Sequence, residues 1–141
     1  MPLQVSAIRN YTRPLAITFA GVDDVLNIRY RAMDQDAITR HRLQRYIEIE
    51  APPAEGSGVP DMEAKAQQYK LAHAESLVAL VTEWDYLDGG KAIAITAKRL
   101  VQEPDRFLVR VLNAIQEDVA PDFLSVKPSK NGFTPEVERA D

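Results

Sequence analysis

Apolar and polar residues alternate in two neighbouring runs near the start of the chain. Each run places an apolar side chain at every second position, which is the period of a β-strand with one buried face. Between the runs lies Gly21–Asp24, a segment of turn-forming residues, so the pattern predicts a β-hairpin. An isolated hairpin is marginally stable in water, so its apolar face needs a cover. The apolar positions are Leu15, Ile17, Phe19, Leu26, Ile28 and Tyr30. Residues 1–13 give mixed signals and could form a short strand or a loose arm.

A helix is predicted to begin at Asp34 or Asp36 and to end near Glu50. Both aspartates are suitable N-caps, with Thr39 as an alternative. The apolar residues that follow fall roughly on one side of a helix, and we expect that side to cover the hairpin. These residues are Ile38, Leu43, Tyr46 and Ile47.

Residues 51–60 contain three prolines, two glycines and a serine. This composition holds neither a helix nor a central strand, and it predicts a flexible linker. The linker would divide an N-terminal hairpin and helix, residues 1–50, from a helical domain, residues 61–121.

A long amphipathic helix is predicted after the linker, with Asp61 as its N-cap. Its apolar residues recur at steps of three and four over about six turns. We expect Trp84 to anchor the end of this helix, where a glycine turn reverses the chain. The turn residues are Asp85, Asp88, Gly89 and Gly90.

The last ordered part is predicted to be helical. A short extended piece at 91–95 leads to Thr96, which can cap a brief helix, and Pro104 begins a final helix that Pro121 ends. The final helix has an apolar stripe of Phe107, Leu108, Val111, Leu112, Ile115 and Val119. Residues 122–141 have few apolar groups and predict a flexible tail.

These elements predict a mainly α fold of the α+β class. The two apolar stripes can pack on each other, and we expect one flank to remain for a partner or a second copy. The candidate interface residues are Leu77, Leu80, Trp84, Phe107, Val111 and Ile115.

Composition and charge argue against several classes of protein. The net charge of −4 argues against broad, charge-driven binding to nucleic acid or to an anionic membrane. The absence of cysteine excludes disulfides and thiolate metal sites. The N-terminal residues lack the basic and then apolar order of a signal peptide, and no apolar run approaches the roughly 20 residues of a membrane span. We therefore expect a soluble, cytoplasmic protein.

Residues that could support catalysis or metal binding form no recognisable pattern. His41 and His73 lack a second ligand at the third or fourth following position. The paired carboxylates lie beside turns or at helix ends, where they are common for structural reasons. We expect no catalytic residue, no cofactor and no metal, and hence no enzyme.

Five arginines lie close together in the N-terminal part. They could form a local nucleic-acid patch, a docking face for an acidic protein, or simply the solvated side of a hairpin and helix. They are Arg29, Arg31, Arg40, Arg42 and Arg45.

The region around the glycine turn resembles the tail assembly chaperones of long-tailed siphoviruses. The similar features are the W-D-x-x-D-G run, an apolar-x-apolar-Thr step, a short helix, a proline, and a helix that ends in an E-D-x-x-P stop. The matching residues are Trp84, Asp85, Asp88, Gly89, Ile93, Ile95, Thr96, Pro104, Asn113, Ala114, Ile115, Glu117, Asp118 and Pro121. The resemblance extends over roughly residues 25–50 and 77–121.

This resemblance implies a partner and a role. Such a protein coats the long, amphipathic tape measure protein and keeps it soluble. It also helps to recruit tail tube protein subunits, and it acts as a homo-oligomer in the cytoplasm of the infected host. It leaves before the virion matures. A virion structural or head–tail joining protein is the alternative, and a small nucleic-acid-binding regulator is less favoured.

Overall fold

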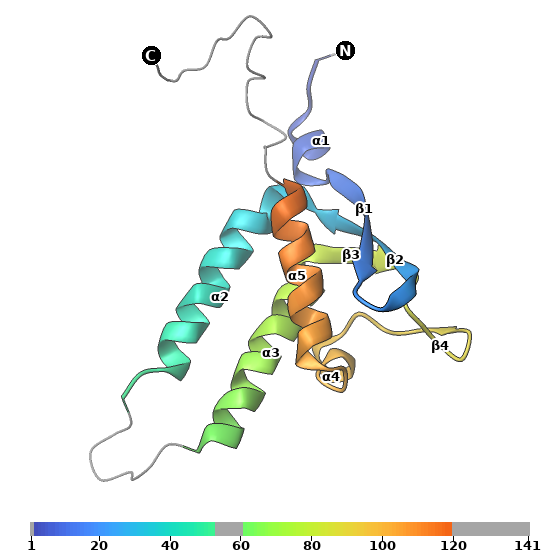
Figure 1. Ribbon diagram of the computed structural model, residues 1–141. Helices are drawn as coiled ribbons and strands as arrows, with labels where there is room; N and C mark the ends of the chain where they lie inside the picture. The colour runs from blue at the N-terminus through green and yellow to red at the C-terminus, as the bar shows by residue number, and fades with distance from the viewer. Residues whose placement is uncertain (1, 53–60, 120–141) are drawn as a thin grey trace, which may run out of the picture.

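The computed structural model describes residues 2–52 and 61–119. In this part of the chain, helices pack against a small antiparallel sheet, so the fold is of the α+β class, as predicted (Figure 1). Most of the predicted linker, Pro121 and the predicted tail at 122–141 lie outside the described residues.

The predicted hairpin is present and longer than expected. Strand β1, Thr12–Phe19, pairs antiparallel with β2, Val22–Arg31. The turn consists of Ala20 and Gly21, not of Gly21–Asp24, and Gly21 has φ +81°. A positive φ is open to glycine at little cost, which explains a tight turn here. The apolar face forms as predicted, with Ile17, Leu26, Ile28 and Tyr30 buried.

The N-terminal residues form a helix where a strand or an arm was predicted. Helix α1 spans Val5–Arg9, and at its end the backbone N–H groups of Asn10 and Tyr11 donate to the carbonyl oxygens of Ser6 and Ile8, at 2.9 and 3.2 Å. One turn of this kind needs little periodicity, so alternation in so short a stretch does not separate helix from strand.

The predicted position of helix α2 is confirmed, but its predicted packing against the hairpin is not. It spans Gln35–Ile49, after the 3-10 turn η1 at Ala32–Asp34. It runs beside α3, away from the sheet (Figure 1). Leu43 and Ile47, expected to cover the hairpin, are 51% and 64% exposed. The apolar residues of α2 are too spread around the helix to compete with the continuous stripe of α5 for the sheet face.

Helix α3, Met62–Leu80, begins as predicted and ends early. The Asp61 carboxylate accepts hydrogen bonds from the backbone N–H groups of Glu63 and Ala64, at 3.0 and 3.2 Å. The helix was predicted to continue to the glycines, but the chain becomes extended at Val81.

The extended segment is strand β3, Val81–Trp84, which adds to the edge of the hairpin in the order β1-β2-β3. Val81 lies opposite Tyr30, and Trp84 lies opposite Ile28. The two parts separated by the predicted linker therefore share one sheet.

Gly89 and Gly90 form the turn of a β-hairpin and not the cap of a helix. They connect β4, Leu87–Asp88, with β5, Lys91–Ala92, and their φ values are +58° and +86°. Positive φ at both central residues is the requirement of the type I′ turn, one of the two common two-residue β-hairpin turns.

The C-terminal helices agree with the prediction. Thr96 caps α4, Ala97–Leu100, by accepting a hydrogen bond from the backbone N–H of Arg99. Helix α5, Asp105–Val119, packs its apolar stripe against α3 and β1. The buried core joins the sheet face to three helices and includes Ile17, Leu26, Ile28, Tyr30, Leu77, Leu80, Leu100, Leu108, Val111, Leu112 and Ile115. None of the helices within the described ranges is long and apolar enough to cross a membrane.

Candidate functional site: an aromatic pocket

An open pocket lies between the tip of the first hairpin and the segment that follows β3. Its volume is about 580 Å³, which is in the range of sites that hold small ligands or the anchoring side chains of a partner. The residues that line it come from the hairpin, from the segment after β3 and from the start of α5. The lining residues are Phe19, Val22, Asp24, Val25, Leu26, Asp85, Tyr86, Leu87 and Phe107.

Stacked aromatic rings form one wall of this pocket. The ring of Phe107 lies 5.5 Å from that of Phe19 and 4.5 Å from that of Tyr86, at interplanar angles of 13° and 19°. Trp84 supports the stack from one side, with its ring 5.4 Å from Tyr86 in an edge-on arrangement. The wall therefore combines residues from β1, from the segment that follows β3, and from α5.

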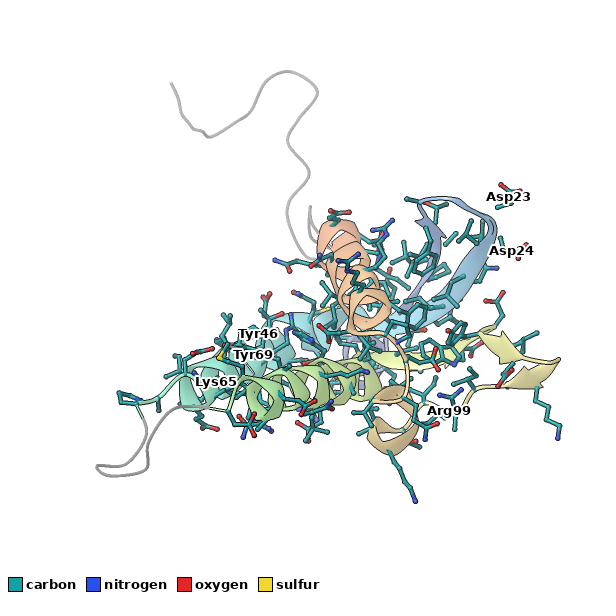
Figure 2. All side chains as sticks on the ribbon, turned by 60° about the horizontal axis from the view of Figure 1, so that its bottom comes forward. Asp23, Asp24, Tyr46, Lys65, Tyr69 and Arg99 are labelled. Atoms are coloured by element: carbon teal, nitrogen blue, oxygen red, sulfur yellow. The ribbon has the colours of Figure 1, made fainter. Side chains whose placement is uncertain are left out.

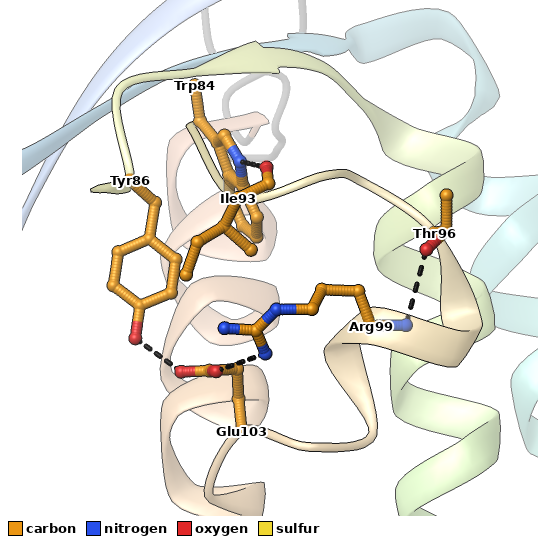
Figure 3. Close-up of polar contacts among 6 residues, drawn as sticks. All are labelled: Trp84, Tyr86, Ile93, Thr96, Arg99 and Glu103. Carbon is orange, nitrogen blue, oxygen red and sulfur yellow. Dashed lines mark hydrogen bonds and ion pairs between the residues drawn. The ribbon is translucent and has the colours of Figure 1, made fainter. Parts of the chain in front are cut away.

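Polar contacts fix the supporting rings (Figure 3). The indole N–H of Trp84 donates to the carbonyl oxygen of Ile93 at 2.9 Å. The hydroxyl of Tyr86 donates to Glu103, whose other carboxylate oxygen accepts from Arg99 at 2.7 Å. Burial, together with the hydrogen bond to Glu103, raises the pKa of Tyr86 to about 12. The phenol is thus neutral at physiological pH and holds one orientation.

Two carboxylates lie among the lining residues. Asp85 accepts hydrogen bonds from the backbone N–H and the side-chain amide of Asn27, both at 2.8 Å. These bonds lower the pKa of Asp85, so the carboxylate is ionised at neutral pH. Asp24 lies with Asp23 at the hairpin tip, where both side chains point away from the body of the protein (Figure 2). The pocket is therefore apolar inside and negatively charged at its edge.

Exposed apolar side chains gather at this pocket. Val22, Val25 and Leu87 are 54%, 43% and 55% exposed, and all three line it. Scattered exposed apolar residues are ordinary, whereas a group around one concave surface is typical of a binding site.

The six predicted interface residues separate into two groups. The side chains of four are at most 1% exposed and pack within the core of the chain, so a partner could reach them only if the helices separated. These four are Leu77, Leu80, Val111 and Ile115. Phe107 lines the pocket, and Trp84 lies behind its wall. The two stripes thus pack mainly on each other.

The four predicted turn residues lie next to the pocket. Asp88, Gly89 and Gly90 form the end of the β4–β5 hairpin, which projects from the body (Figure 1). Asp85 precedes this hairpin and lines the pocket itself.

A part-buried polar cluster joins three helices and was not anticipated from the sequence. His73 of α3 shares hydrogen bonds with the Asp105 carboxylate of α5 at 2.7 Å and with the Tyr46 hydroxyl of α2 at 2.8 Å. The spacing of residues along α3 offers His73 no partner, whereas both observed partners come from other helices. No group of three or more metal-ligating side chains that could hold an ion lies within residues 2–52 and 61–119.

The arginine cluster is largely engaged within the fold. Arg29 donates to Thr12, and Arg31 donates to the carbonyl oxygen of Ala79 at 2.9 Å. Arg42 is buried. Arg45 forms an ion pair with Glu75 at 2.8 Å, so four of the five arginines are buried or bonded to other residues of the fold.

The sequence pattern predicts the pocket residues in different elements. Phe19 and Leu26 were assigned to the hairpin face, whereas Leu87 was assigned to the end of the long helix. One signal did exist, because Val22, Val25 and Leu87 fit none of the predicted apolar stripes. Comparisons with protein-family models, with curated proteins and with solved structures found no match to this chain.

Proposed function

We propose that this protein is a tail assembly chaperone of a long-tailed bacteriophage, which binds an apolar segment of a long partner chain and catalyses no reaction. The observation that carries the proposal is the open aromatic pocket with three exposed apolar side chains around it. Aromatic pockets of this size hold the anchoring side chains that supply most of the binding energy in protein complexes.

The resemblance of the glycine-turn region supplies the identity of the partner in this proposal. Of the residues that carry it, Asp85 lines the pocket, Trp84 supports its wall, and Asp88 and Gly89 belong to the adjoining hairpin. The partner is the tape measure protein, which the chaperone keeps soluble in the host cytoplasm while tail tube protein subunits are recruited. The chaperone is then absent from the mature virion.

Coating a long client requires many copies, so the proposal includes self-association. Leu43 and Ile47 lie one turn apart on α2 and are both more than half exposed. This face lies on α2, apart from the residues that line the pocket, which leaves the pocket available to the client.

Co-expression with the tape measure protein encoded in the same genome tests the proposal. The wild-type chain should keep the tape measure protein in the soluble fraction, and Leu87→Asp should abolish this effect because a charge at the pocket disfavours apolar contact. Leu3→Asp is the matched control, since Leu3 is 75% exposed and does not line the pocket.

Two outcomes would contradict the proposal. If the tape measure protein precipitated equally with and without the wild-type chain, it would not be the client of this protein. Stoichiometric amounts of the chain in purified virions would instead favour a structural or head–tail joining role.

A further inference from the structure

The charged residues that line the pocket are all acidic. Among the nine lining residues, Asp24 and Asp85 are acidic and none is basic. Asp24 is exposed, and the Asp85 carboxylate is held in place by Asn27. An occupant of the apolar interior therefore meets negative charge at the edge.

We propose that the pocket selects basic amphipathic segments, in which a lysine or arginine lies beside an apolar anchor residue of the partner chain. The proposal rests on the proposed function in that it describes the client segment that the same pocket recognises. It adds a charge rule, because an apolar pocket alone would accept acidic, neutral and basic segments alike.

The geometry suits both parts of such a segment. The stacked rings of Phe19 and Phe107 present a flat apolar wall for an aliphatic or aromatic anchor. Lysine and arginine have long aliphatic stems, so their stems can lie along the same wall while the cationic group reaches Asp24 or Asp85. Aromatic faces also attract cations directly.

A second copy of this chain fits the pocket less well. The chain has a net charge of −4, and an acidic copy would meet an acidic edge. We therefore assign the pocket to a basic segment of a different chain, and self-association to a different surface.

Paired peptides provide the test. The probe is a fluorescein-labelled amphipathic peptide of leucine, alanine and lysine with about 18 residues, which is about five helical turns. Its partner has glutamate in place of every lysine. Fluorescence anisotropy with the full-length protein should show binding of the lysine peptide that is at least about tenfold tighter, and that weakens as salt screens the charges.

Two charge-reversal variants separate local from global charge. Asp24→Lys changes the pocket edge, whereas Glu117→Lys makes the same net change on an exposed residue near the far end of α5. We expect Asp24→Lys to weaken binding of the lysine peptide about tenfold or more and to strengthen binding of the glutamate peptide, while Glu117→Lys changes neither.

Equal binding of the two peptides, or equal effects of the two variants, would overturn the charge rule. If the tape measure protein is still kept soluble by Asp24→Lys, only the charge rule fails and the proposed function stands. If the peptides obey the rule but the tape measure protein is not bound, the proposed function fails instead. Loss of self-association in Asp24→Lys without any peptide binding would assign the pocket to a second copy.

Discussion

Tyr30 has no exposed surface, yet its hydroxyl makes a strong polar contact. It donates to Oδ2 of Asp118 at 2.6 Å, and this carboxylate oxygen also accepts a hydrogen bond from Arg13 at 3.1 Å. Asp118 lies in the last turn of α5, so these bonds attach the end of that helix to β1 and β2. A buried hydroxyl needs such a partner, because an unpaired polar group in a core is costly.

Replacing Tyr30 by phenylalanine removes this hydrogen bond and keeps the ring. We expect the free energy of unfolding, measured by urea denaturation, to fall by about 1.5–3 kcal/mol, as for hydrogen bonds to charged groups. Tyr69→Phe is the control, since its hydroxyl bonds the exposed Glu50 carboxylate. A loss of the same size in both variants would show that burial does not strengthen the Tyr30 bond.

Tyrosine ionisation predicts sensitivity to alkali. The unfolded chain releases tyrosine protons near pH 10, whereas the folded chain retains that of Tyr86 up to about pH 12, and burial raises the pKa of Tyr30 as well. Above pH 10 the unfolded state binds fewer protons, so stability falls with pH by up to about 1.4 kcal/mol per unit for each tyrosine. Denaturation between pH 9 and about pH 11.5 measures this slope. The slope should become shallower in Tyr86→Phe. An unchanged slope would contradict the raised pKa of Tyr86.

At the scale of elements, locally encoded features were predicted well. The stripe of α5 repeats at helical spacing within one segment, and the caps at Asp61 and Thr96 depend only on the residues that follow them. The hairpin faces follow from alternation in the same way. In each case the signal lies within a few residues of the structure that it specifies.

Strand β3 shows what such signals cannot supply. Val81–Trp84 continues the helical spacing of α3, and no glycine or proline interrupts it. Its β-branched and aromatic residues favour a strand only weakly. Pairing with β2 decides the outcome, and its partners Ile28 and Tyr30 lie more than fifty residues earlier. The pocket was missed for the same reason, since Asp85, Trp84 and Phe107 were singled out but assigned to a helix end and a helix stripe.

The β4–β5 turn gives a test at this scale. A Cβ added to Gly89 or Gly90 would meet no atom within 4 Å, so substitution costs backbone strain only. We expect alanine at either position to destabilise the hairpin by about 1–2 kcal/mol. The amide of Ile93, which donates to the carbonyl oxygen of Tyr86, should then exchange its hydrogen about tenfold faster. In Gly89→Asn the amide of Ile93 should exchange more slowly than in Gly89→Ala, because asparagine tolerates a positive φ better than alanine does.

At the scale of the whole molecule, the two sides of the segment 51–60 share one sheet and one core. Strands β1 and β2 precede it, while β3, α3 and α5 follow it. The buried face of the hairpin packs against the later helices, and one contiguous core contains residues from both sides. The pocket is also shared, since both the first hairpin and the start of α5 contribute residues to its lining.

This arrangement predicts the behaviour of two fragments, 1–56 and 57–141. Fragment 1–56 alone should show no cooperative thermal unfolding, because Ile17, Leu26 and Ile28 lose the helices that cover them and an uncovered hairpin is marginal in water. Mixing isotopically labelled 1–56 with unlabelled 57–141 should restore dispersed amide resonances for β2, since β3 then pairs with it. Cooperative unfolding of 1–56 by itself would instead mean that the N-terminal hairpin and helix form an independent domain. In that case the aromatic wall, which needs Phe19 beside Phe107, would depend on how two domains dock.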